Sequence, residues 1–304
     1  MSQFVTPPRS QQPGVSAPSV VAAIDARRAA NQHTLSFEFF PPKEGGETTL
    51  WETFDRILEV APDWVSLTYG AGGSNRAKSF TVLERMAPAV TTVGHLTCIG
   101  ASEASTTEAI RKFEDLGVKS VLALRGDAPK DNPDALAQGE LKTALELVEV
   151  AHRVSQLEIG VAAFPEGHPE SASLEHDAKV FALKKAAGAS YGFTQLFFGV
   201  DYYVSMVEAA KAAGADLPIV PGLMPVSNGK QLLRMAAMSG AAVPENLARQ
   251  LDESDEATAK AIGMEFTIQL GRDLLAAGAP GLHIFTLNQS AAALELATGV
   301  GLIN

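Results

Sequence analysis

Eight short runs rich in β-branched and aromatic residues recur along the chain, and longer amphipathic stretches separate them. This alternation is typical of βα units, in which each strand of a parallel sheet is followed by a helix that packs on the sheet. Eight such units predict a closed (β/α)8 barrel, the TIM-barrel fold class. The runs are Thr34–Phe40, Trp64–Tyr69, Val93–Ile99, Ser120–Leu124, Ile159–Phe164, Tyr191–Phe198, Pro218–Met224 and Gly281–Leu287.

Helices are predicted between the runs, and several of them end at glycine or proline, as helix stops do. A glycine beside a predicted helix end recurs at positions 117, 188, 214 and 278, where it lets the chain turn into the next strand. The long segment Ser239–Gly278, between the seventh and eighth runs, predicts extra helices. The clearest helical segments are Thr48–Val60, Glu103–Leu116, Leu141–Val154, Leu174–Ala187 and Val204–Ala213.

The predicted domain organisation is a short arm followed by one large domain. Residues 1–19 are rich in Pro, Ser and Gln and offer little to bury, so we expect a disordered or loosely docked arm. Residues 20–304 are expected to form a single barrel. A hydrophobic content of 46% over 304 residues suffices for a core of that size.

Charge and cysteine content exclude several classes of protein. The chain has 24 Lys and Arg against 35 Asp and Glu, and a net charge of -11 disfavours binding to nucleic acid or to an acidic membrane surface. The single cysteine, Cys98, allows neither an intramolecular disulfide nor a Cys-rich zinc site. The sequence contains no apolar run long enough to span a membrane and no signal peptide. We therefore expect a cytoplasmic protein with no nucleic-acid or membrane partner.

Polar residues at the ends of the predicted strands are the candidates for chemistry, because the carboxyl ends of barrel strands carry the active site. Glu38 ends the first run beside two phenylalanines and two prolines. Apolar surroundings disfavour the ionised carboxylate, which suits a general acid, although pairing with a basic neighbour is equally compatible with this position. His95 lies in the third run, where a hydrogen-bonded core role is the simpler interpretation. The fourth run leads into Arg125-Gly126-Asp127, which fits either recognition of a polar ring or phosphate, or a rim ion pair.

Other rim segments fit ligand binding with less specificity. Small residues after Thr68 and Tyr69, including Ala71, let a ligand approach the backbone. Asp177 and Lys184 are seven residues apart, on one face of a predicted helix, which fits an elongated ligand or a solvated stripe. Gln195 is an amide in an apolar run. Its side chain either hydrogen-bonds to backbone groups in the core or recognises the donor and acceptor edge of a heterocycle.

The loop after the fifth run, residues 165–170, holds two carboxylates and a histidine, but no closed ligand set is evident and we expect no metal. The sequence contains no GxGxxG, GxSxG or P-loop motif. Taken together, an acid in an apolar setting, an aspartate beside an arginine, several amides and flat apolar surfaces suit a pocket for two aromatic heterocycles.

Nine ordered motifs resemble one family, the catalytic barrel of the methylenetetrahydrofolate reductases in their bacterial single-domain form. The resemblance spans the chain from about residue 35 to residue 302, and the number and order of the motifs make it specific. The motifs are SFEFFPPK (36–43), VSLTYGAGGS (65–74), HLTCIG (95–100), LALRGDAP (122–129), VAAFPEGHPE (161–170), LKKAAGA (183–189), TQLFF (194–198), PGLMPVSN (221–228) and HIFTLN (283–288).

The resemblance implies a ping-pong reduction of 5,10-methylenetetrahydrofolate to 5-methyltetrahydrofolate by NADH or NADPH through FAD, supplying methyl groups for methionine synthesis. It places the acid that protonates the folate N10 at Glu38 and the flavin-tuning aspartate at Asp127. It implies a homo-oligomer, and no regulatory domain after the barrel. The implied FAD contacts are Thr68, Tyr69, Ala71, His95, Arg125, Gly126, Asp127, Phe164, His168, Asp177 and Lys184. The implied substrate contacts are Gln195, Gln231, Met235 and Gln289.

Four positions depart from the pattern of the well-known enteric form. Phe164 stands where tyrosine is common, Val180 replaces a polar flavin neighbour, and Met235 replaces a phenylalanine. Gln289 stands where arginine is usual, so a neutral amide replaces a cation that could pair with a phosphate or carboxylate. Three alternatives stay open: a barrel of this family with a different electron donor, one without tightly bound FAD, and a folate- or flavin-binding barrel without turnover.

Overall fold

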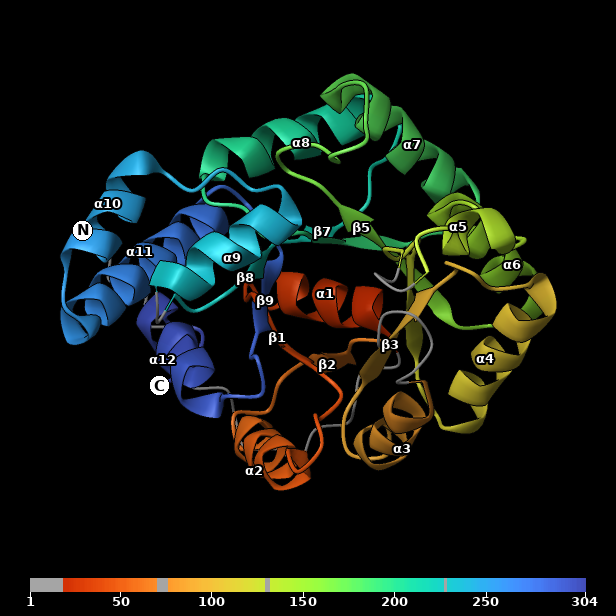
Figure 1. The fold of residues 1–304 in the computed structure, drawn as a ribbon, viewed down its shortest axis with the longest axis horizontal. Coiled ribbons are helices and arrows are strands. Elements are labelled where there is room, and N and C mark those ends of the chain that lie inside the picture. Colours follow the sequence, from red (N-terminus) through yellow and green to blue (C-terminus); the bar gives the residue numbers. More distant parts are fainter. Residues whose placement is uncertain (1–18, 70–75, 129–131, 227–228) are drawn as a thin grey trace.

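The computed structural model describes residues 19–69, 76–128, 132–226 and 229–304, which form a parallel barrel surrounded by helices (Figure 1). Every paired strand is parallel, in the order β7-β6-β5-β4-β3-β2-β1-β9-β8. This confirms the predicted (β/α)8 fold class. The strands are β1 Thr34–Phe39, β2 Trp64–Leu67, β3 Thr92–Thr97, β4 Ser120–Leu124, β5 Glu158–Ala163, β6 Tyr191–Thr194, β7 Ile219–Val220, β8 Gly222–Leu223 and β9 Gly281–Phe285.

The seventh predicted strand is divided at Pro221 into β7 and β8. β7 pairs with β6, and β8 pairs with β9, so the two halves together close the ring. Proline has no N–H to donate to a neighbouring strand, which explains the break in the ladder. Its carbonyl still accepts a hydrogen bond of 2.9 Å from the His283 N–H. The nine strands are therefore eight barrel positions, one of them interrupted.

Helices alternate with the strands, and the predicted segments are found with small shifts at their ends. α8 begins at Val200, four residues before the predicted start. Extra helices lie between β8 and β9, as predicted, and no described helix is long and apolar enough to cross a membrane. The helices that follow β1 along the chain are α2 Glu47–Leu58, α3 Arg76–Met86, α4 Glu103–Asp115, α5 Ala135–Gln138, α6 Ala144–Val154, α7 Leu174–Ala186, α8 Val200–Ala212, α9 Gly229–Ser239, α10 Glu245–Glu253, α11 Glu256–Ala276 and α12 Ser290–Val300.

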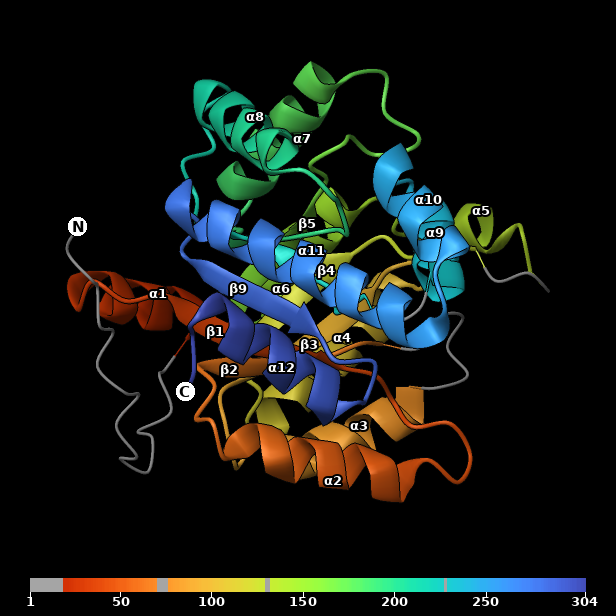
Figure 2. The same ribbon diagram turned by 90° about the vertical axis from the view of Figure 1, so that its left-hand side faces the viewer.

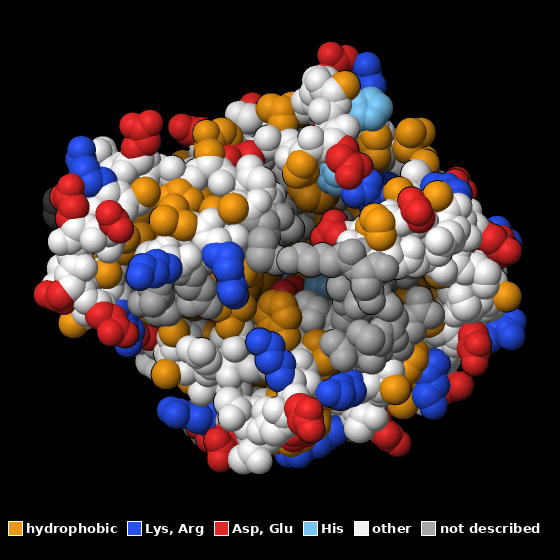
Figure 3. Space-filling view, in the orientation of Figure 1, with side chains coloured by type: hydrophobic (Ala, Val, Ile, Leu, Met, Phe, Trp, Pro, Cys, Tyr) orange, Lys and Arg blue, Asp and Glu red, His pale blue; other side chains and the backbone are white. Residues whose placement is uncertain are grey.

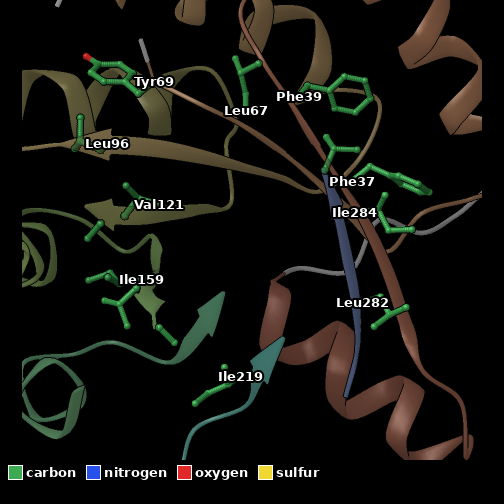
Figure 4. Close-up of a cluster of buried hydrophobic side chains, with 14 of the residues drawn as sticks. Phe37, Phe39, Leu67, Tyr69, Leu96, Val121, Ile159, Ile219, Leu282 and Ile284 are labelled. Carbon is green, nitrogen blue, oxygen red and sulfur yellow. The ribbon is translucent and has the colours of Figure 1, made fainter. Parts of the chain in front are cut away.

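The main core lies between the outer face of the barrel and the helices (Figure 4). On β1, Leu35, Phe37 and Phe39 belong to this core and are fully buried. Because side chains alternate along a strand, the residues between them, Ser36 and Glu38, face the barrel interior. The first strand therefore supplies an apolar outer face for folding and a polar inner face for the site.

Helix α1, Val20–Ala29, closes the amino-terminal end of the barrel, opposite α9 and α10 (Figures 1 and 2). Sequence reasoning did not predict this helix. Its buried residues join a cluster with side chains from the barrel interior, among them Trp64 and Phe193. The Glu158 carboxylate accepts the backbone N–H groups of Val20 and Val21 at 2.7 and 3.1 Å, where the positive end of the helix dipole favours an anion. Residues 1–18 of the predicted arm lie outside the described residues.

Truncating Ile24 tests whether α1 is part of the folded core. Ile24 is 1% exposed, so Ile24→Ala should lower the free energy of unfolding by about 2–4 kcal/mol, the usual cost of a buried Ile-to-Ala change. Arg28→Ala is the control on the same helix, because its ion pair with Asp25 is exposed and should contribute less than about 1 kcal/mol. Urea denaturation measures both values. If both variants lost the same small amount of unfolding free energy, α1 would not be packed as described.

Candidate active site

A cavity of about 650 Å³ opens at the carboxyl ends of β4, β5 and β6 and extends between the helices that follow them. The parallel strands all run toward this end of the barrel, and the surface of the molecule is hollowed there (Figure 3). The size is within the usual range for small-molecule sites. The lining includes eight of the residues that the resemblance implies for FAD and substrate: Arg125, Gly126, Asp127, Phe164, His168, Asp177, Lys184 and Gln195.

Arg125 follows β4 and forms a two-pronged ion pair with Glu170. Its Nη2 donates to Glu170 Oε1 at 2.9 Å. Asp127, two residues later, is exposed. The Glu170 side chain is 63% exposed, so this pair is weakly stabilising and an anionic ligand can compete for the guanidinium. The rim ion pair considered from the sequence is therefore present, but its carboxylate partner comes from the loop after β5.

The loop after β5 is fixed to the start of α7. The backbone N–H of His168 donates to Asp177 Oδ2 at 2.9 Å, and the imidazole packs edge-on against Phe164, with ring centroids 4.7 Å apart. Gly167 between them has φ 92°, a conformation that favours glycine. Burial lowers the pKa of Lys184, two turns along α7, and the charge of Asp177 opposes this shift. The wall of the cavity thus holds a partly desolvated cation, which favours an anionic ligand.

Glu38 lies inside the mouth of the barrel, between two histidines. Its Oε2 is 3.5 Å from His95 Nε2 on β3 and 3.7 Å from His283 Nε2 on β9. Among the described residues, no Lys or Arg forms a salt bridge with Glu38, so its basic neighbours there are imidazoles. Burial lowers the pKa of His95 to about 4, which leaves this ring neutral at pH 7. His95 Nε2 is buried without a hydrogen-bond partner among the described residues, as expected of a group that meets a ligand.

Sequence reasoning missed His283, and it considered Glu166 only as a possible metal ligand. His283 was visible as a lone histidine in an apolar strand, but its partners come from β1 and β2. Glu166 Oε2 accepts the N–H of Ala242 at 2.8 Å and so ties the loop after β5 to the α9–α10 connection. In the part of the chain that the structure describes, no three His, Cys, Asp or Glu side chains gather to hold a metal.

The remaining predicted residues lie on several elements. Thr68 is half-buried at the end of β2, and the Tyr69 ring points outward, 6.1 and 6.3 Å from the rings of Phe80 and Phe113. Only the backbone of Tyr69 is therefore placed to meet a ligand at the mouth. Ala71 lies outside the described residues.

The predicted substrate contacts also come from separate elements. Gln195 is exposed after β6, and Gln289 is exposed just before α12, where it makes no capping hydrogen bond. Met235 on α9 packs against an apolar cluster that contains Leu196 and Phe198. Gln231 belongs to the same helix, and its side chain is outside the described set. A separate groove of about 560 Å³, between α10 and α11, contains none of the predicted residues.

Comparison with known proteins gives a consistent result. A model of the methylenetetrahydrofolate reductase family matches residues 23–301. The 5,10-methylenetetrahydrofolate reductase of Pectobacterium carotovorum is 35% identical over 263 residues, covering 84% of this chain and 86% of that protein. That of Escherichia coli K12 is 34% identical over 266 residues, covering 85% and 88%. "Methylenetetrahydrofolate reductase (NADH) 1" of Arabidopsis thaliana is 35% identical over 305 residues, covering 94% of this chain and 51% of that protein.

A solved structure resembles the fold at lower sequence identity. It is an uncharacterised protein from Clostridium thermocellum, which binds two copies of 5-methyl-5,6,7,8-tetrahydrofolic acid. The TM-score is 0.62 at 16% identity, and the match covers 92% of this chain and 98% of that one. At this identity the likeness supports the barrel architecture alone.

The lowered pKa of His95 predicts a pH dependence of stability. Between pH 6.5 and about 4 the unfolded chain binds a proton at His95 that the folded chain does not, so stability is lost as the pH falls. From pH 7 to pH 5 this loss should be about 2 kcal/mol, and His95→Gln should remove that part of it. Urea denaturation at both pH values measures the difference, with His176→Gln, on the exposed side of α7, as the control. An unchanged pH dependence in His95→Gln would contradict the assignment.

Proposed function

The chain belongs to the methylenetetrahydrofolate reductase family, an oxidoreductase family, and we propose that it reduces 5,10-methylenetetrahydrofolate with NADH or NADPH through FAD in a ping-pong reaction. The product, 5-methyltetrahydrofolate, would supply methyl groups for methionine synthesis in the cytoplasm. The observation that carries this proposal is the cavity at the carboxyl ends of β4, β5 and β6, which gathers eight of the residues implied for FAD and substrate. The buried carboxyl group of Glu38 lies at the mouth of the same barrel.

The chemistry of the cavity lining supports FAD as its ligand. An extended dinucleotide needs apolar walls for its rings and cations for its diphosphate, and both are present. Arg125 pairs with an exposed carboxylate that an anion can displace, and Lys184 is partly desolvated. Phe164 and Val180 add apolar surface. When bound, FAD would carry a hydride from the nicotinamide to the folate.

Glu38 would hold the proton that the folate N10 receives. Its side chain is buried, and its Oε2 lies 3.5 Å from His95 Nε2 and 3.7 Å from His283 Nε2. A protonated Glu38 carboxyl group would donate when the substrate nitrogen comes within hydrogen-bonding distance. Protonation of N10 opens the five-membered ring and prepares the carbon for reduction.

Asp127 and the amides would orient the ligands. Asp127 is an exposed carboxylate at the rim of the cavity. It forms no salt bridge with a described cation, although its charge contributes to raising the pKa of Arg125. Its negative charge would favour a cationic folate intermediate. Gln195 lines the same cavity and offers both donor and acceptor to a heterocycle. Gln231, Met235 and Gln289 would complete the substrate side from α9 and the start of α12.

Glu38→Gln tests the acid role through separate half-reactions. In anaerobic stopped-flow, the FAD-loaded variant should be reduced by NADH or NADPH as fast as wild type. Re-oxidation by methylenetetrahydrofolate should fall by about 100-fold or more, the usual contribution of a general acid. Glu44→Gln, in an exposed loop six residues away, is the matched control and should leave both half-reactions unchanged. Normal re-oxidation of Glu38→Gln would exclude the acid role.

Lys184→Met tests the site proposed for FAD. Removing the partly buried cation should weaken FAD binding by about 10-fold or more, the effect of one lost charge-assisted contact. Lys179→Met is the control on the same helix, because Lys179 is exposed and pairs with Glu175 at 2.7 Å. Flavin fluorescence quenching gives both dissociation constants. Equal FAD dissociation constants for Lys184→Met and Lys179→Met would indicate that the flavin binds elsewhere.

A further inference from the structure

Asn288, in the turn that follows β9, joins the end of β9 to the end of β1 through its side chain. Its Oδ1 accepts the backbone N–H of Phe40 at 3.0 Å, and its Nδ2 donates to the carbonyl oxygen of Phe40 at 2.9 Å. One amide side chain therefore satisfies both backbone groups of Phe40, as a neighbouring strand would. Phe40 lies two residues after Glu38, at the mouth of the barrel.

The backbone of β9 does not continue this pairing itself. The last registered pair between β1 and β9 is Glu38 with Phe285. After Thr286 the chain turns away, with φ 51° at Leu287 and φ 57° at Asn288. Such left-handed conformations are uncommon outside glycine, above all for a bulky residue such as leucine, and they persist where the surrounding structure enforces them. The side chain of Asn288 thus replaces the ladder where the backbone leaves it.

Three further hydrogen bonds hold this turn in place. The Thr286 hydroxyl donates to the carbonyl oxygen of Glu38 at 2.6 Å and accepts the N–H of Asn288 at 3.0 Å. The Thr53 hydroxyl, on α2, donates to the carbonyl oxygen of Asn288 at 3.0 Å. Both threonines are buried, so water competes little for these bonds. Asn288 is therefore held at its N–H, at its carbonyl group and at its side chain.

The Asn288 amide acts on the segment that carries the proposed acid. On the side of β2, the N–H of Thr68 donates to the carbonyl oxygen of Phe39 at 3.0 Å. On the side of β9, the contact beyond Glu38 is the one between Asn288 and Phe40. Without the amide, Phe40 would lose both of these hydrogen bonds, and the backbone after Glu38 could shift. A small displacement of a reacting group can lower a rate strongly.

The turn after β9 lies outside the cavity proposed for FAD. The lining residues that the structure describes run from Ala123 to Ser239 and include none from β1, β9 or this turn. A change at Asn288 should therefore spare FAD binding and reduction of the flavin by the nicotinamide. Its effect should fall on the step in which Glu38 meets the folate.

We propose that Asn288 is a positioning residue for the reduction of methylenetetrahydrofolate, and that its pairing with Phe40 holds the Glu38 carboxyl group where the folate N10 can meet it. The inference rests on the acid role proposed for Glu38 and deepens it. Asn288 acts through the backbone of β1 and does not itself exchange a proton with the substrate.

Asn288→Gly tests the proposal, because it removes the amide and leaves a residue that readily adopts the left-handed conformation. In anaerobic stopped-flow with FAD-loaded protein, re-oxidation by methylenetetrahydrofolate should be about 10- to 100-fold slower than in wild type. Reduction by NADH or NADPH and the FAD dissociation constant should be unchanged. Asn31→Gly is the matched control, because Asn31 has φ 54° and is exposed after α1, at the amino-terminal end of the barrel. Re-oxidation of Asn288→Gly at the wild-type rate would overturn the proposal.

A double-mutant cycle separates positioning of Glu38 from a general structural role. If Asn288 acts through Glu38, the variant that combines Glu38→Gln with Asn288→Gly should be re-oxidised as slowly as Glu38→Gln alone. A further loss of about 10-fold in the double variant would show an effect independent of Glu38 and would reject the proposal.

Amide hydrogen exchange shows whether Asn288→Gly keeps its fold and where it changes. Exchange should be faster at the end of β1, including Phe40, and unchanged in β4, β5 and β6. Faster exchange throughout the barrel, or unchanged exchange at Phe40, would contradict a local role of the Asn288 amide.

The outcomes separate this inference from the function on which it rests. Normal re-oxidation in Glu38→Gln removes the acid role, and the positioning role with it. Slow re-oxidation in Glu38→Gln together with normal re-oxidation in Asn288→Gly rejects the role of Asn288 alone.

Discussion

A carboxyl group buried without a strong cation is the constraint on which the rest of this site depends. Transfer of a carboxylate out of water is costly unless a charge or several hydrogen-bond donors offset that cost. Glu38 is 9% exposed, and the basic groups around it, among the described residues, are two imidazoles. The polar inner face of β1 and the serines beside His283 give this carboxyl group its setting. The apolar outer face of the same strand holds it in the fold.

The cavity at the carboxyl ends of β4, β5 and β6 is bounded by the loops after these strands, and side-chain contacts hold these loops in place. Asp177 holds the backbone of His168, Glu170 holds Arg125, and Glu166 reaches the α9–α10 connection. The first two contacts use groups that also line the cavity, so ligand binding and loop order are coupled. Replacement of tyrosine by Phe164 leaves an edge-on contact with His168, and Val180 adds another apolar wall. At Phe164 and Val180, a bound flavin would therefore make apolar packing contacts.

Much of the fold could be predicted from the sequence, because eight apolar runs separated by amphipathic segments leave few alternatives to a parallel barrel. The division of the seventh strand follows from the missing N–H of Pro221, a local feature that the sequence contains. Helix α1 was not predicted, because only Val20, Ala23 and Ile24 are buried on it and their partners lie inside the barrel. The outward direction of Tyr69 follows from strand alternation, which favours Thr68 for the interior. The contact between His283 and Ser36, 247 residues apart, depends on the register of β9 with β1, and no local pattern shows it.

A crystal structure of the protein with FAD and 5-methyltetrahydrofolate bound is the most direct test of the proposed site. We predict the flavin in the cavity lined by Arg125 and Lys184, and the folate N10 within hydrogen-bonding distance of the Glu38 carboxyl group. A folate bound with N10 remote from Glu38, or a flavin in the groove between α10 and α11, would contradict it.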